Sequence, residues 1–98
     1  MRFDIIITGT KSEALDQHVK RSLSHALDQH DQHVESLRVR LRDTNGPRGG
    51  VDQHVRIIVG LHGRPSVIIE ETGEDAYATI STAAERVKQT VGRELKKK

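Results

Sequence analysis

Within VESLRVRLRD, residues 34–43, apolar and charged residues alternate strictly from position 37 to position 42. Successive side chains of a β-strand point to opposite faces of its sheet, so this pattern predicts a strand with one buried and one solvent-facing side. The buried side would carry Leu37, Val39 and Leu41. The solvent-facing side would carry an arginine row, Arg38, Arg40 and Arg42.

Three more strands are expected around this one. RFDIIIT, residues 2–8, is β-branched and apolar, as strands tend to be. The turn-rich DTNGPRGG, residues 43–50, separates the alternating strand from VDQHVRIIVGLHG, residues 51–63. After the turn GRP comes a fourth candidate, SVIIEE, residues 66–71. The strand at 51–63 would place four apolar side chains on one face: Val55, Ile57, Val59 and Leu61.

Two other stretches have their apolar residues at helical spacing. The first covers about residues 11–30, and Ser12 is expected to cap its start. The second covers about residues 74–96, with Thr72 and Asp75 as the predicted capping pair. The two apolar arcs are formed by Leu15, Val19, Leu23, Ala26 and Leu27, and by Tyr77, Ile80, Ala84, Val87, Val91 and Leu95.

The order of these elements, β-α-β-β-β-α, predicts an α+β fold. Two helices on one face of a four-stranded, mainly antiparallel sheet would bury both apolar arcs. The opposite face of the sheet would stay open and carry the arginine row. A chain of 98 residues is the size of one small domain, so we expect a single domain over residues 1–98.

Composition excludes several classes of protein. The chain has no Cys, which excludes disulfide bonds and thiolate metal sites. No run of residues is long enough to span a membrane, and the N-terminus is too short and too acidic for a signal peptide. We therefore expect a cytoplasmic protein with no membrane partner. Phe3 and Tyr77 are the two aromatic residues, too few for base recognition by stacking, whereas phosphate contacts stay available.

The histidines raise the question of a metal site or of acid–base catalysis. The tripeptide DQH occurs four times, starting at Asp16, Asp28, Asp31 and Asp52. Zinc ligands must converge at roughly 2 Å from the metal, and the helical spacing and strand contexts of these histidines do not favour it. No HExxH spacing, nucleophile elbow or Gly-rich phosphate loop is present. We expect no metal, cofactor, small-molecule substrate or enzymatic activity, and surface histidines whose protonation would add positive charge toward RNA.

Basic residues are unevenly distributed, although the formal net charge is only +2. On the last predicted helix Arg86 and Arg93 share a face, as Arg21 and His25 do on the first. If the helices pack side by side, these faces form one basic surface, and the planar fork of arginine suits phosphate. The alternatives are a solvated helix face and, for the arginine row, charges that keep an open sheet face from pairing.

Three stretches of the sequence carry a resemblance to a known family. They are ITGTKSEALDQHV at residues 7–19, VESLRVRLRD, and above all EDAYATISTAAERVKQTV at residues 74–91. Together they resemble the ribosome hibernation-promoting factor family, also called ribosome-associated inhibitor or sigma-54 modulation protein. The last helix of that family begins Glu-Asp-Met-Tyr-Ala-Ala-Ile. The residues that match it here are Glu74, Asp75, Tyr77, Ala78 and Ile80.

The resemblance implies the same fold and binding to the small ribosomal subunit, in the channel of messenger and transfer RNA. Translation would then be inhibited in stationary phase or under stress. The resemblance is to the short form, without the C-terminal dimerisation domain of longer members. Neutral or acidic residues stand at three positions that are often basic in the family, Ser22, Asp28 and Gln89. The residues expected to contact ribosomal RNA are Lys20, Arg21, His25, Arg38, Arg40, Arg42, Arg86, Lys88, Arg93, Lys96 and Lys97.

The competing hypothesis is a protein–protein module on the same fold that does not bind the ribosome. Such a module would dimerise through an edge strand or through the open sheet face, and a weak homodimer stays open as an expectation. General binding of double-stranded RNA is a weaker alternative, because two helices on an antiparallel sheet are similar to that domain. The extra first strand and the Asp-x-Tyr start of the last helix speak against it.

Overall fold

The structure is a computed structural model that describes residues 5–10, 12–45 and 51–97. Its order of elements confirms the prediction, with a 3₁₀ helix added after the first helix. Residues 2–4 of the predicted first strand and residues 46–50 of the predicted loop lie outside the described part of the chain. The elements are β1 Ile5–Thr8, α1 Glu13–Leu27, η1 Asp28–His33, β2 Val34–Asn45, β3 Val51–Leu61, β4 Arg64–Gly73 and α2 Ala76–Lys96.

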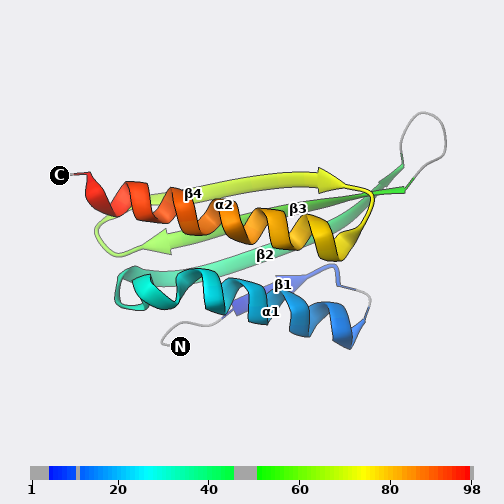
Figure 1. Ribbon diagram of the computed structural model, residues 1–98, viewed down its shortest axis with the longest axis horizontal. Helices are drawn as coiled ribbons and strands as arrows, with labels where there is room; N and C mark the ends of the chain where they lie inside the picture. The colour runs from blue at the N-terminus through cyan, green and yellow to red at the C-terminus, as the bar shows by residue number, and fades with distance from the viewer. Residues whose placement is uncertain (1–4, 11, 46–50, 98) are drawn as a thin grey trace.

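The strands form one sheet in the order β1-β2-β3-β4. β1 runs parallel to β2, with Ile5 opposite Leu37, and the other two pairs are antiparallel. The sheet is therefore mainly antiparallel, as predicted. The parallel pair needs a connection that returns to the same end of the sheet, and α1 provides it. Figure 1 shows α1 and α2 side by side along the length of the sheet, on the same face.

The core lies between that face of the sheet and the two helices. The inward-facing residues of β2 and β3 are those that the alternation predicts, and all are at most 3% exposed. Val19, Leu23 and Leu27 of α1 pack into the same cluster with Ile80 and Val87 of α2. Truncation of one of these large side chains to Ala is expected to cost about 2–5 kcal/mol, because the cavity left behind collapses only in part.

Side-chain caps fix where both helices begin. The hydroxyl of Ser12 accepts a hydrogen bond from the Leu15 amide at 3.1 Å, which confirms the predicted N-cap of α1. Asp75 caps α2 by accepting from the amides of Tyr77 and Ala78. Thr72 lies within β4, so the predicted capping pair is wrong and Asp75 caps α2 alone.

The end of α1 differs from the prediction. The α-helix was expected to reach residue 30, but it ends at Leu27, and the following DQHDQH winds as the 3₁₀ helix η1. Leu27 is the last residue of the apolar arc, and no residue of η1 is buried. Without apolar side chains to hold it against the core, this polar segment tightens into 3₁₀ turns and leads directly into β2 at Val34.

Candidate nucleic-acid interface

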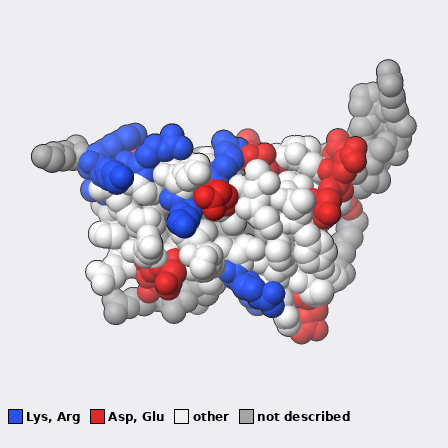
Figure 2. Space-filling view, in the orientation of Figure 1, with Lys and Arg blue, Asp and Glu red and all other residues white. Residues whose placement is uncertain are grey.

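Cationic side chains gather over the C-terminal half of α2, on the face shown in Figure 2. Lys97 forms an ion pair with Glu94 at 3.1 Å. The other three cations of this segment are exposed, and within the described residues no carboxylate pairs with them. We call them the α2 cation group: Lys88, Arg93 and Lys96.

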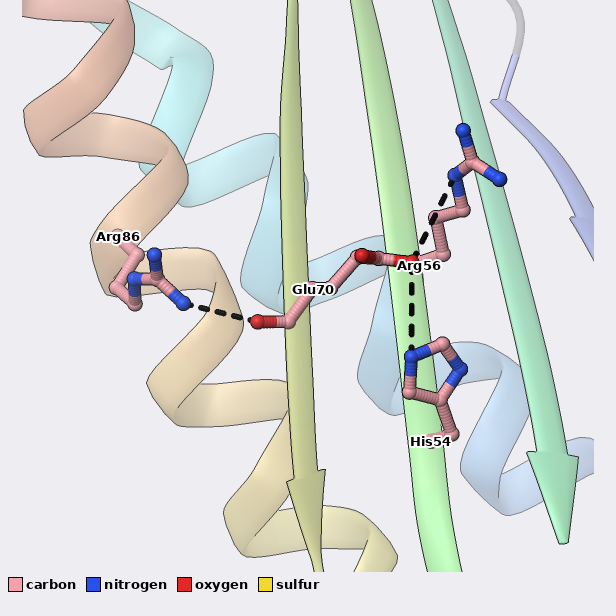
Figure 3. A network of polar contacts seen from close by, with 4 residues as sticks. All are labelled: His54, Arg56, Glu70 and Arg86. Carbon is pink, nitrogen blue, oxygen red and sulfur yellow. Dashed lines mark hydrogen bonds and ion pairs between the residues drawn. The ribbon is translucent and has the colours of Figure 1, made fainter. Parts of the chain in front are cut away.

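Arg86 lies on the same helix but is turned to β4. Its Nη1 donates to a carboxylate oxygen of Glu71 at 2.7 Å and to the backbone carbonyl of Glu70 at 2.9 Å. Figure 3 shows this guanidinium reaching from α2 to the outer edge of β4. Arg86 is exposed, as Arg93 is, but unlike Arg93 it is held by a carboxylate on the neighbouring strand.

The basic residues predicted on α1 are exposed, but they form a separate group. Arg21 and His25 are open to solvent, whereas Lys20 is paired with Asp16 at 3.1 Å, one turn earlier. In Figure 2 the blue atoms over α1 stay apart from those over α2. The predicted single basic surface is thus two patches on neighbouring helices.

A groove of about 660 Å³ runs between η1 and the last turns of α2. Two histidines of the DQHDQH segment, His30 and His33, form one of its walls. The sequence did not single out these two histidines as RNA contacts, because a helix to residue 30 followed by a strand would not have brought them together. From α2 the groove is lined by Glu85, Lys88, Gln89, Gly92, Arg93, Leu95 and Lys96.

His30 is the one group in the described residues whose acid–base behaviour is clearly shifted. Partial burial lowers the pKa of His30 below its ordinary value of 6.5, and the positive charges of His33 and Lys88 lower it further. The ring lies beside the backbone of Gly92, where an added Cβ would be 3.8 Å from Nε2. The imidazole therefore forms part of the wall of the groove beside α2, and because its pKa is lowered it is mainly neutral at pH 7.

The arginine row lies on the sheet face opposite the helices, as predicted. Arg38, Arg40 and Arg42 are exposed there, and Arg56 of β3 stands opposite Arg40. Glu70 of β4 reaches across the sheet toward β3 (Figure 3) and lines a small hollow with Arg40, Arg42 and Arg56. It lies 3.9 Å from Arg56 and 3.6 Å from His54.

The same face also carries apolar side chains. Ile6, Ile58 and Ile68 fall in one line across the sheet, with Arg38 between the first two. Ile6 and Ile68 are each 53% exposed. A shallow hollow of about 820 Å³ lies over β1, β2 and β3. Its walls include Ile6 and Ile58 together with the arginine row and Arg56.

The remaining histidines do not converge. His18 of α1 contacts the start of α2, where its Nε2 lies 3.2 Å from the Tyr77 carbonyl oxygen and 3.2 Å from the Ser81 hydroxyl. Its ring is also 5.0 Å from that of Tyr77, which is 44% exposed and not buried as predicted. In the described residues no three His, Asp or Glu side chains form a group that could hold a metal ion. No described helix is long and apolar enough to cross a bilayer.

Comparison with known proteins identifies the family. A sequence profile described as sigma 54 modulation protein / S30EA ribosomal protein matches residues 5–98. No curated protein sequence matches the chain. A ribosomal subunit interface protein from Coxiella burnetii superposes with a TM-score of 0.78 at 15% identity, over 99% of this chain and 100% of that one.

The N-terminal domain of Protein Y from Thermus thermophilus superposes with a TM-score of 0.67 at 24% identity, over 95% of this chain and 98% of that one. At these identities the two structures show a common fold. The profile match over nearly the whole chain shows more, because it rests on the sequence itself. The chain belongs to the sigma 54 modulation protein / S30EA ribosomal protein family.

Proposed function

We propose that the protein binds the small ribosomal subunit and inhibits translation as a hibernation factor, in stationary phase or under stress. Its place would be the channel that messenger and transfer RNA occupy. Membership of a ribosome-associated family supports a ribosomal partner. The α2 cation group is the observation that carries the RNA contact, since these three exposed side chains have no carboxylate partner in the described residues.

Such a protein would act by occupying space, without catalysis and in the cytoplasm. Cations that meet RNA phosphates release bound counterions, so affinity rests on phosphate contacts and weakens as salt rises. Arg93 would contribute two parallel hydrogen bonds to a phosphate, and the two lysines would act as point charges. Arg21 and His25 on α1 would add a second patch beside the first.

Three of the predicted RNA contacts differ from the α2 cation group because they already have acidic partners. Arg86, Lys20 and Lys97 each have a carboxylate partner in the free protein. Binding to RNA would have to break these pairs, so their net contribution is expected to be smaller. The arginine row on the open sheet face is a second candidate surface for RNA.

Co-sedimentation with small subunits, at low and at moderate salt, tests the proposal. One variant reverses the α2 cation group to Glu, and a matched variant reverses Arg38, Arg40 and Arg42, with the same change of net charge. We expect the first variant to lose binding and the second to keep most of it. Competition by initiator transfer RNA would support the decoding channel. If the unmodified protein does not co-sediment with small subunits at low salt, the proposal is refuted.

A protein partner on the open sheet face is the second candidate function, and the isoleucine line favours it. Exposed apolar side chains among arginines suit an acidic protein segment with apolar residues. A second copy of the same face is disfavoured, because it would oppose arginine to arginine. Sedimentation velocity of the free protein checks this point: a mass that rises with concentration, and returns to that of a monomer in Ile6→Ser with Ile68→Ser, would show self-association instead.

A further inference from the structure

We infer that the groove between η1 and α2 is a binding site for a phosphate group of a polynucleotide, with His30 and His33 in its wall and with proton uptake by His30 on binding. This site adds to the proposed function a contact whose strength depends on pH. The inference rests on the proposed function only in taking ribosomal RNA as the polynucleotide; the phosphate site itself rests on the residues that line the groove.

The walls of the groove are unusually rich in groups that favour an anion. η1 contributes two imidazoles, and α2 contributes three cations, Lys88, Arg93 and Lys96, within about two turns. Glu85 is the carboxylate of α2 in this wall, and its side chain accepts a hydrogen bond from Gln89 at 3.5 Å. The sum of these charges is positive before either histidine is protonated.

A second hollow beside η1 shows where the acidic side chains of this segment lie. Asp28 and Asp31 line that neighbouring depression together with His33 and the two glutamines of the segment. The carboxylates of η1 are thus collected on one side of this short helix, and His30 lies on the other side, toward α2. A phosphate would enter on the side of His30, where three cations of α2 and one carboxylate, Glu85, line the groove.

The His30 ring lies close to α2 at Gly92, where a Cβ would be 3.8 Å from Nε2. Lys88 and Arg93 flank this point of the helix and line the same groove. The histidine therefore stands among the cations of the helix, and its partial burial keeps it neutral when the groove is empty. A bound phosphate would offset the charges that now oppose its protonation.

Proton uptake follows from this arrangement. An anion favours the charged imidazole, so the pKa of His30 should rise when the groove is filled, and by linkage the affinity for the anion should rise as pH falls. From about pH 7.5 to about pH 6 we expect a gain of roughly three- to tenfold in affinity. In a cell whose cytoplasm acidifies during starvation, the protein would then bind the RNA more tightly.

Titration of the imidazole rings by NMR tests the site with the whole chain and two probes. The probes are a single-stranded oligouridine and inorganic sulfate, whose charge is constant over this pH range. A rise in the pKa of His30 with oligouridine alone supports a polynucleotide site. A rise with sulfate as well supports a site for any tetrahedral oxyanion. No rise with either probe overturns the inference.

Binding of oligouridine by variants gives the second readout. We expect the pH dependence to vanish in His30→Gln with His33→Gln and to persist in His62→Gln, an exposed histidine in the turn after β3 and outside the groove. The same gain in both variants would overturn the inference. The assay needs no ribosome, so loss of co-sedimentation would count against the proposed function and leave this result standing.

Discussion

The guanidinium of Arg86 donates to the backbone carbonyl oxygen of Glu70 at 2.9 Å, across the gap between α2 and the outer edge of β4. The same nitrogen lies 2.7 Å from the carboxylate of Glu71. One side chain thus satisfies a carbonyl on the unpaired edge of the sheet and neutralises a half-buried acid. Arg86 therefore stabilises the free protein, whether or not it also contacts RNA.

We therefore expect Arg86→Glu to destabilise the protein. The substitution removes both contacts and places a second carboxylate beside Glu71, and the partial exposure of the pair limits the loss to about 1–2 kcal/mol. Urea unfolding followed by circular dichroism measures it. Arg93→Glu, with no such partner among the described residues, should change stability by less than about 0.5 kcal/mol. Equal midpoints for the two variants would contradict this reading of Arg86.

The cap of α2 should contribute measurably to stability. Asp75 accepts from two amides that would otherwise lack a partner at the start of the helix. We expect Asp75→Ala to cost about 1 kcal/mol in thermal or urea unfolding. Glu74→Ala, one residue earlier and not in the cap, is the matched control. The expectation fails if the two alanine variants are equally stable.

The same substitution should have opposite effects at two glycines. Gly92→Ala should stabilise α2 by roughly 0.5–1 kcal/mol, because the new Cβ meets only His30 at an ordinary contact distance. Gly9→Ala should destabilise by about 1–3 kcal/mol, because φ there is +87° and the Cβ would collide with the carbonyl of Leu41. Melting temperatures that shift in the same direction would refute one of the two local descriptions.

Stability should fall on acidification in a way that depends on His30. Its pKa is lowered in the folded protein, so below about pH 6.5 the unfolded chain binds more protons than the folded one. Stability is then lost as pH falls through this range, and the loss levels off below the folded pKa. The free energy of unfolding can be measured at a series of pH values in chloride salt, without phosphate or sulfate. It should fall less on acidification in His30→Gln than in the unmodified protein. Parallel curves for the two proteins would contradict the lowered pKa.

Salt dependence should report the number of phosphate contacts on α2. If the α2 cation group meets three phosphates, replacing it with Gln should reduce the slope of log affinity against log salt by about 2–3. Binding to small subunits over a range of KCl concentrations gives this slope. A variant that binds more weakly with an unchanged slope would mean that the three side chains act on the fold and not on RNA.

The sequence predicts the strands and their exposed faces well, and it predicts long-range contacts poorly. Alternation in residues 37–42 specifies which arginines face away from the core, because a strand has a period of two residues. It does not specify how far α2 slides along β4, and that position decides the pairing of Arg86 with Glu71. Partners fifteen residues apart on different elements leave no local pattern.

The groove between η1 and α2 also could not be predicted from the sequence. DQHDQH has no apolar residue, which indicates that the helical arc stops at Leu27. The residues alone do not indicate that the segment winds as a 3₁₀ helix, because that depends on the distance the chain must cover to reach β2. Since this winding brings His30 and His33 to α2, the site could be found only in three dimensions.

The parallel placement of β1 has a consequence for the order of folding. In the described chain this four-residue strand pairs with β2 alone, and α1 and η1 separate the partners in sequence. The antiparallel strands β2, β3 and β4 are joined by shorter connections and can assemble first, whereas the pairing of β1 must await closure of a long loop. The N-terminal strand should therefore dock last, and its amides should exchange with solvent first.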